Sequence, residues 1–391
     1  MTSDVLNAAA MVDRARADTG LEDLGEDTWQ EGLDRLIDSL LSEARLSEVG
    51  VHIAAAMIVN DLTSRIRVTD WHSRYPEIGE APINAPVVIA GQPRTGTTIL
   101  FDLLAQDSRF RVPLTWEVSA PHPPPETATY RTDPRIAAAD AARDMSEVLN
   151  PGFQAIHPSG AERGQECVAI TSGDFRSILF GTVFRTPTYT RWLIDEADMA
   201  PAFRYHRRFL QLLQWRHPGE RWLLKTPGYL WCLTELFEAY PDATIVHTHR
   251  DPLKVIASTA SLTEHLHRMA SGATGVAELA MEWADYLVEG NDRSVTARQD
   301  GSVPHGHAVD LRFANLVADP LAAISELYDG LEIGFTADAE QRMRTFLDDN
   351  PADKHGVHRY LFSATGLNEA ETRERTRRYE EFFDVEHEPL G

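Results

Sequence analysis

The sequence predicts an α/β fold, a three-layer sandwich in which helices cover both faces of a central parallel sheet. Short apolar runs recur along the chain, and each is followed by a turn and a segment with helical spacing of apolar residues. This alternation of strand and helix is typical of parallel sheets. A glycine loop lies between the first run and its helix, which predicts a P-loop-like nucleotide site beyond the carboxyl end of a strand.

The predicted strands are short and apolar, which suits strands that are buried on both faces. In chain order they are residues 87–90, 222–224, 243–248 and 309–313. Helices are expected after each of them, at residues 99–104, 230–239, 253–262 and 320–328. The last expected element is a charged helix over residues 368–383 that packs through Tyr379, Phe382 and Phe383.

The amino-terminal part has a helical pattern. Between residues 5 and 67, apolar residues such as Leu33, Leu36 and Ile37 recur three or four positions apart, which predicts two or three amphipathic helices. Prolines and a glycine between residues 75 and 86 break this pattern. We therefore expect an N-terminal helical segment at residues 1–78 and a larger α/β catalytic domain at residues 79–391.

Composition narrows the classes of partner. The chain has 391 residues, of which 37 are basic and 60 acidic, giving a formal net charge of -23. Such a charge disfavours nucleic acid and anionic membranes as partners, although a few cations can still form a local pocket for a small anion.

No apolar run approaches the roughly 20 residues that span a bilayer, and no signal peptide is recognisable, so the cytoplasm is the expected location. Cys167 and Cys232 are expected to be buried, reduced thiols.

The glycine loop has the spacing of a P-loop but not its lysine. Gly91 and Gly96 are separated by four residues, and Thr97 follows where a P-loop has lysine. Backbone N–H groups at the start of a helix bind anions, and Arg94 supplies a positive charge. Because a P-loop lysine acts together with magnesium on β- and γ-phosphates, its absence argues against ATP or GTP hydrolysis, and no metal is expected.

A second anion site is predicted after the strand at residues 243–248. Arg250 follows this strand, and Asp251-Pro252 is typical of a helix start. Ser258 lies eight residues after Arg250, so a guanidinium and a hydroxyl could converge on one phosphate. The pairs His247/His249 and His265/His267 lack the further ligands of a metal site.

Together these motifs resemble those of sulfotransferases that use 3′-phosphoadenosine 5′-phosphosulfate (PAPS), and the chain is most similar to a bacterial branch of that family. The resemblance runs from about residue 86 to the carboxyl terminus. It implies PAPS as the donor, the bisphosphate PAP as a product, and no metal. The implied 5′-phosphosulfate loop contains Pro93, Arg94, Thr95, Gly96, Thr97 and Thr98; Arg250 and Ser258 match the 3′-phosphate site, and Lys354, His355 and Gly356 a loop that closes over it.

Candidate catalytic residues are cations near the leaving group and a base for the acceptor. Arg94 and Lys225 are expected to stabilise charge on the leaving phosphate. The family has a catalytic histidine two residues after the strand-end lysine, but Pro227 occupies that position here. Glu117 and Glu166 are therefore the two candidates for the general base.

The expected acceptor is an alcohol or phenol on a small lipophilic molecule. Its site is predicted to be formed by the proline-rich loop 118–126 and segment 153–184, with more than half of the local aromatic residues in the core. The local aromatic residues, of which the others would contact the acceptor, are Trp116, Phe153, Phe175, Phe180, Phe184, Tyr189 and Trp192.

Two other functions and the assembly state stay open. A P-loop small-molecule kinase would share the strand, loop and helix, but it requires the missing lysine and a metal-binding carboxylate. A catalytically silent nucleotide-binding protein would explain the missing histidine. A homo-oligomer is compatible with the sequence.

Overall fold

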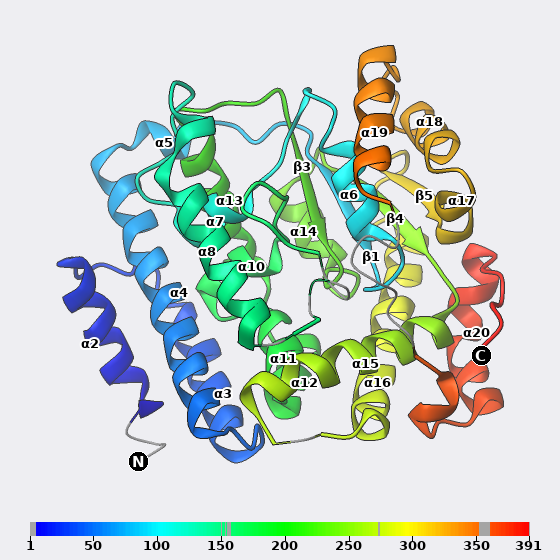
Figure 1. Cartoon of the computed structure of the whole chain (residues 1–391), viewed down its shortest axis with the longest axis horizontal. Coiled ribbons are helices and arrows are strands. Elements are labelled where there is room, and N and C mark those ends of the chain that lie inside the picture. Colours follow the sequence, from blue (N-terminus) through cyan, green and yellow to red (C-terminus); the bar gives the residue numbers. More distant parts are fainter. Residues whose placement is uncertain are drawn as a thin grey trace.

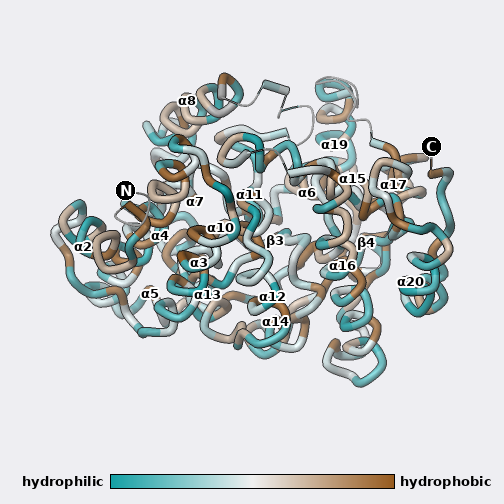
Figure 2. The backbone as a smooth tube through the Cα atoms, turned by 90° about the horizontal axis from the view of Figure 1, so that it is seen from below, coloured by the Kyte–Doolittle hydropathy of each residue, from teal (hydrophilic) through white to brown (hydrophobic). Residues whose placement is uncertain are grey.

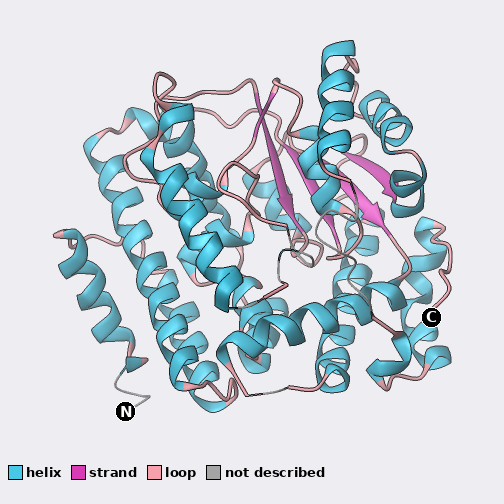
Figure 3. Cartoon of the chain, in the orientation of Figure 1, coloured by secondary structure: helices cyan, strands magenta, loops and turns pink. Residues whose placement is uncertain are grey.

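The central feature of the computed structural model is a parallel sheet enclosed by helices (Figures 1 and 3). The structure describes residues 5–149, 151, 152, 154, 158–272, 274–351 and 360–390. Within them the sheet has five strands in the order β2-β3-β1-β4-β5, every neighbouring pair being parallel. The strands are β1 (Val87–Gly91), β2 (Phe110–Arg111), β3 (Arg221–Thr226), β4 (Thr244–His249) and β5 (Ala308–Arg312).

Alternate residues of the strands enter two different hydrophobic clusters, as the period of two in a strand requires. Val87 and Ile89 pack with one layer of helices, formed by α6 (Thr97–Leu104), α18 (Pro320–Gly330) and α19 (Ala337–Asp349). Val88 and Ala90 pack with the other layer, which includes α13 (Ala200–Gln214), α14 (Leu233–Ala239) and α16 (Val276–Gln299). The predicted three-layer sandwich is therefore confirmed.

Residues 5–74 form the predicted N-terminal helices, on the left of Figure 1, which pack on the second layer. They are α2 (Ala8–Thr19), α3 (Trp29–Ser42) and α4 (Glu48–Arg74), and their buried residues belong to the same cluster as the α13 face of the sheet. Ser47 caps α4 by accepting a hydrogen bond from Gly50 N at 3.0 Å. The domain boundary at residue 78 stays a prediction.

The described part of the chain contains further helices. They are α5 (Glu77–Glu80), α7 (Thr115–Ser119), α8 (Pro134–Leu149), α10 (Val168–Thr171), α11 (Leu179–Val183), α12 (Pro187–Asp195), α15 (Pro252–Ala270), α17 (Phe313–Ala318) and α20 (Glu369–Phe383). Among the described residues, no helix combines the length and the apolar character that crossing a bilayer requires.

The C-terminal helix α20 confirms most of its prediction. It is mainly hydrophilic in colour in Figure 2, and it buries Tyr379, which is 1% exposed. Phe382 was expected to pack inward but is 40% exposed, and its ring contacts that of Phe383 with the ring centres 4.7 Å apart. Cys167 and Cys232 are free and buried, as predicted.

Candidate active site

The glycine loop joins β1 to α6 in a conformation that depends on its glycines, although Arg94 also has a positive φ, of 69°. Gly96 has φ of 86°, in the left-handed region that favours glycine. A Cβ atom on Gly91 would lie 2.0 Å from the hydroxyl of Thr248, so the loop and β4 approach closely. The Thr95 hydroxyl fixes this approach, with contacts of 2.7 Å to Gln92 O and 2.6 Å to the Thr248 hydroxyl.

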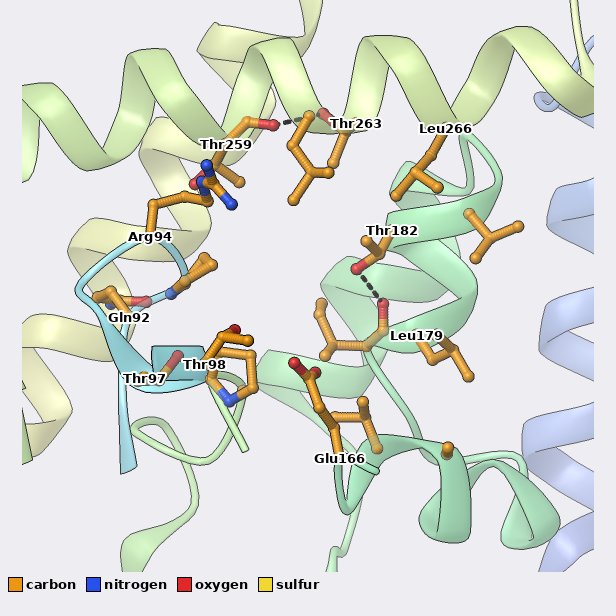
Figure 4. A pocket seen from close by; sticks show the side chains of 18 of the residues that line it. Gln92, Arg94, Thr97, Thr98, Glu166, Leu179, Thr182, Thr259, Thr263 and Leu266 are labelled. Carbon is orange, nitrogen blue, oxygen red and sulfur yellow. Dashed lines mark hydrogen bonds between the residues drawn. The ribbon is translucent and has the colours of Figure 1, made fainter. Parts of the chain in front are cut away.

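The start of α6 is open to an anion. Among the described residues no side chain caps this helix, so its first N–H groups keep their hydrogen-bonding capacity. Thr97 and Thr98 in the first turn line a cavity together with Gln92, Pro93 and Arg94 (Figure 4). Such a terminus favours negative charge through both its N–H groups and its dipole.

The structure brings Arg94, Ser258 and Arg250 together. Arg94 Nε donates to Ser258 Oγ at 3.0 Å, and Arg250 Nη1 donates to the carbonyl oxygen of Arg94 at 2.9 Å. The Arg250 guanidinium also lies 4.1 Å from the centre of the Phe313 ring. Burial lowers the pKa of Arg94, with a further lowering from Arg250, as expected where cations gather.

Lys225 and Glu166 form a pair beside the loop. Lys225 Nζ lies 2.7 Å from Glu166 Oε1 and donates to Thr98 Oγ1 at 3.1 Å. Cys167 N donates to the carbonyl oxygen of Lys225 at 2.9 Å, and this bond fixes the segment that carries Glu166 at the end of β3. Glu166 lines the cavity with its side chain 16% exposed, whereas that of Lys225 is 2% exposed.

Glu117, the other candidate base, lies elsewhere. Its side chain is fully buried, forms an ion pair with Arg111 and accepts a hydrogen bond from Leu114 N at 2.9 Å. Glu117 is not among the residues that line the cavity. The structure therefore brings Glu166, and not Glu117, next to Lys225 and the glycine loop.

The cavity, of about 330 Å³, extends from the loop into an apolar region. Two hydroxyls there are bonded to their own helices: Thr263 donates to Thr259 O at 3.0 Å, and Thr182 to Ile178 O at 2.9 Å (Figure 4). Pro227 also lines the cavity. The apolar wall comes from α11, α12, α15, α16 and nearby loops: Ile178, Leu179, Val183, Ile194, Trp231, Leu262, Leu266, Trp283 and Leu287.

Sequence reasoning missed most of this wall. Positions 259, 262, 263 and 266 share one face of α15, and this spacing is visible in the sequence, but it is equally typical of a face buried in the core.

The described part of segment 153–184 contributes residues to the cavity wall, whereas loop 118–126 does not line the cavity. The described aromatic residues suggested for the acceptor lie in the core: Trp116, Phe175, Phe180, Phe184, Tyr189 and Trp192. Phe153, Lys354, His355 and Gly356 lie outside the described residues.

One group of side chains could in principle hold a metal ion. Its potential ligand atoms, which come from His247, His249 and Asp310, lie within 4.8 Å of one another. Arg298 already donates to both oxygens of Asp310, at 2.9 Å each, and Tyr379 pairs with His249 Nδ1 at 2.8 Å. A metal ion would have to displace a guanidinium, so we assign none to this group. Its rings pack against Tyr379 and Phe383 and join α20 to the sheet.

Comparisons with known proteins agree with this geometry. The chain is 28% identical to sulfotransferase STF9 from Mycobacterium avium, with a TM-score of 0.88 over 97% of both chains. It is 28% identical to sulfotransferase STF1 from Mycobacterium tuberculosis H37Rv, with a TM-score of 0.84 over 95% of this chain and 99% of that one. A curated relative, the omega-hydroxy-beta-dihydromenaquinone-9 sulfotransferase Stf3 of Mycobacterium tuberculosis, is 26% identical over 274 residues, which are 68% of this chain and 67% of Stf3. A model of the sulfotransferase family matches residues 86–337, more than half of the chain, and the chain therefore belongs to the sulfotransferase family.

Proposed function

We propose that this sulfotransferase moves a sulfuryl group from PAPS to a hydroxyl of a small lipophilic acceptor. One observation carries the proposal: the lysine-free glycine loop and the Arg94–Ser258–Arg250 cluster lie at one end of an apolar cavity, beside the Lys225–Glu166 pair. The loop and the cluster suit a phosphorylated donor, and the apolar region suits a lipophilic acceptor.

The donor is expected to place its two anionic groups on two sets of residues. The N–H groups at the start of α6, with Thr97, Thr98 and Arg94, would hold the 5′-phosphosulfate. Arg250 and Ser258 would hold the 3′-phosphate. Lys354, His355 and Gly356 are proposed to complete the 3′-phosphate site, as in the family that the sequence resembles.

The reaction is an in-line displacement at sulfur. The acceptor oxygen forms a bond to sulfur while the bond from sulfur to the bridging oxygen breaks, and that electron pair passes to the 5′-phosphate. Lys225 and Arg94 stabilise the charge that develops on this leaving group. Glu166 takes the proton of the acceptor hydroxyl, a role that Pro227 cannot fill.

The acceptor class follows from the wall of the cavity. The hydroxyls of Thr182 and Thr263 donate to helix carbonyls, so the apolar side chains of α11, α15 and α16 decide what binds there. The name of the relative Stf3 specifies an omega-hydroxylated menaquinone derivative, which is a lipophilic alcohol. We propose an acceptor of the same general chemistry, a hydroxyl group on a largely hydrocarbon body.

Replacing Glu166 by glutamine tests the function and the base together. With labelled PAPS and a panel of long-chain alcohols and phenols, the wild-type protein is expected to transfer sulfate without added magnesium. E166Q is expected to lose about 100-fold or more in turnover, the usual contribution of a general base, while PAP affinity measured by calorimetry changes little. E162Q, at an exposed carboxylate that pairs with Arg131, is the matched control and should keep full turnover.

Three results would contradict the proposal. A wild-type protein that does not bind PAP would exclude the donor. A protein that binds PAP but transfers to no acceptor in the panel would be a silent nucleotide-binding protein. Transfer of phosphate from ATP, dependent on magnesium, would identify a kinase instead.

A further inference from the structure

The C-terminal segment, residues 384–390, contacts the arginine that we assign to the donor's 3′-phosphate. Glu388 Oε1 accepts a hydrogen bond from Arg250 Nε at 2.8 Å, and Oε2 accepts one from Nη2 at 3.0 Å. These parallel bonds form the bidentate arrangement in which a guanidinium binds carboxylates and phosphates alike. The pair is shielded from solvent, with side-chain exposures of 14% for Arg250 and 31% for Glu388.

Several contacts hold this segment in place. Glu388 N donates to Asp251 Oδ2 at 2.7 Å, and Asp251 is itself held by two bonds from Arg373, at 2.7 and 2.8 Å. Leu390 packs on the cluster formed by Leu253, Ala257 and Phe362. The carboxylate is thus presented to Arg250 by a structured segment, which lies between the start of α15 and α20.

The contacts with Glu388 and Arg94 use three of the five N–H donors of Arg250. Its Nη1 atom donates to the carbonyl oxygen of Arg94, and Nε and Nη2 donate to Glu388. The edge formed by Nε and Nη2 is one of the two that can bind two oxygens of a phosphate in parallel. A phosphate can therefore bind this edge of Arg250 only after the Glu388 carboxylate has left it.

We propose that Glu388 is an internal competitor of the donor's 3′-phosphate: it leaves Arg250 when PAPS binds and returns when PAP departs. This inference rests on the proposed function, which assigns the 3′-phosphate to Arg250. A phosphate with nearly two negative charges displaces a carboxylate with one, because its attraction to the guanidinium is greater. Because Glu388 must leave Arg250 first, the carboxylate lowers the affinity for 3′-phosphorylated nucleotides and disfavours rebinding of the product PAP.

The test compares two nucleotides that differ only in the 3′-phosphate. Affinities for PAP and for adenosine 5′-phosphate are measured by calorimetry on the wild-type chain, on E388Q and on a chain that lacks residues 386–391. E386Q is the matched control, since it removes the same charge from the same segment at an exposed side chain. Thermal unfolding of each variant shows whether it is folded.

E388Q and the shortened chain are expected to bind PAP about tenfold more tightly, within the usual range for coupled binding events. Adenosine 5′-phosphate should bind all four proteins equally, since it does not compete for Arg250. E386Q should behave as the wild type does. In stopped-flow measurements, PAP should associate with E388Q faster by a similar factor, because no carboxylate has to leave Arg250 first.

Unchanged PAP affinity in both E388Q and the shortened chain overturns the inference while leaving the proposed function intact. An equal gain for both nucleotides also overturns it, because the effect would then not depend on the 3′-phosphate. If PAP binds to none of the four proteins, the proposed function is wrong and this inference is wrong with it.

Discussion

Glu166 and Glu117 are both carboxylates paired with a cation, but their surroundings give them different roles. Glu117 is fully buried between Arg111 and the backbone of Leu114, where its charge holds α7 in place. Glu166 pairs with Lys225 at the wall of the cavity, where a substrate hydroxyl can reach it. Removing a partner from a buried pair costs about 3–5 kcal/mol, so we expect Glu117 to support stability rather than chemistry.

At the same scale, Asp61 on α4 makes stability depend on pH. Burial raises its pKa from 3.8 to about 7, although a hydrogen bond from Ser172 acts in the opposite direction. Between pH 4 and 7 the folded chain therefore holds a proton that the unfolded chain has lost, and stability falls as pH rises through this window. Above pH 7 the charged, buried carboxylate costs up to about 4 kcal/mol.

D61N should remove this dependence. The free energy of unfolding, measured with urea, is expected to rise in D61N relative to the wild type as pH goes from 4 to 8, with the two curves converging at low pH. D338N, at an exposed carboxylate paired with Arg342, should track the wild type throughout. Parallel pH curves for D61N and the wild type would show that Asp61 is ionised in the folded chain at low pH.

At the scale of the elements, the loop between β1 and α6 depends on glycine for space as well as for conformation. A Cβ atom on Gly96 would lie 2.9 Å from Phe313 Cδ2 and 3.1 Å from Leu316 Cδ2. G96A should therefore shift the loop against α17 and weaken PAP binding about tenfold or more, because small displacements of binding groups are costly. Calorimetry measures this loss.

The variant G20A separates the cost of a positive φ from the loss of space. Gly20 ends α2 with φ of 68°, and no described atom lies within 4 Å of a Cβ placed there. Both variants should lose about 1 kcal/mol of stability from the unfavourable φ, but only G96A should lose affinity for PAP. Full PAP affinity in G96A would show that the loop binds the donor without its present conformation.

The elements also show what the sequence can predict. Strands such as β1 and β4, and the start of α15 at Pro252, follow from local signals: apolar runs, turn glycines and a helix-starting Asp-Pro. Strand β2 was missed because it has two residues, Phe110 and Arg111, and depends on pairing with β3.

The apolar wall on α15 was missed because a helix face that lines a cavity has the same spacing as one that meets the core. The choice between Glu117 and Glu166 depends on contacts with Arg111 and Lys225 that only the fold creates.

At the scale of the whole molecule, a strongly acidic chain concentrates cations in one place. The net charge is -23, yet Arg94, Lys225 and Arg250 meet at the carboxyl edge of the sheet. Parallel strands end together at that edge, so β1, β3 and β4 each deliver one of these residues or the loop that carries it. The fold thus produces a local group of cations that the overall charge would not suggest.

The N-terminal helices share buried contacts with the rest of the fold. Arg65 on α4 is buried and donates to Asp174 Oδ1 at 2.9 Å, to Leu24 O at 2.8 Å and to Gly173 O at 3.2 Å. Ile58, Leu62 and Ile66 of the same helix are at most 1% exposed and share the core of the α13 layer. Without residues 1–74, this apolar surface would face water, and Asp174 would lose Arg65.

We therefore expect the full chain to unfold in one cooperative transition, and a fragment of residues 75–391 to be unfolded or aggregated. Calorimetric unfolding of the full chain, together with circular dichroism and PAP binding of the fragment, measures this. R65M in the full chain is the milder variant, and it should cost about 3–5 kcal/mol because it leaves Asp174 with Arg176 alone as a charged partner. If the fragment melts cooperatively and binds PAP as the full chain does, the segment before residue 78 is a separate domain whose buried contacts the rest of the fold does not need.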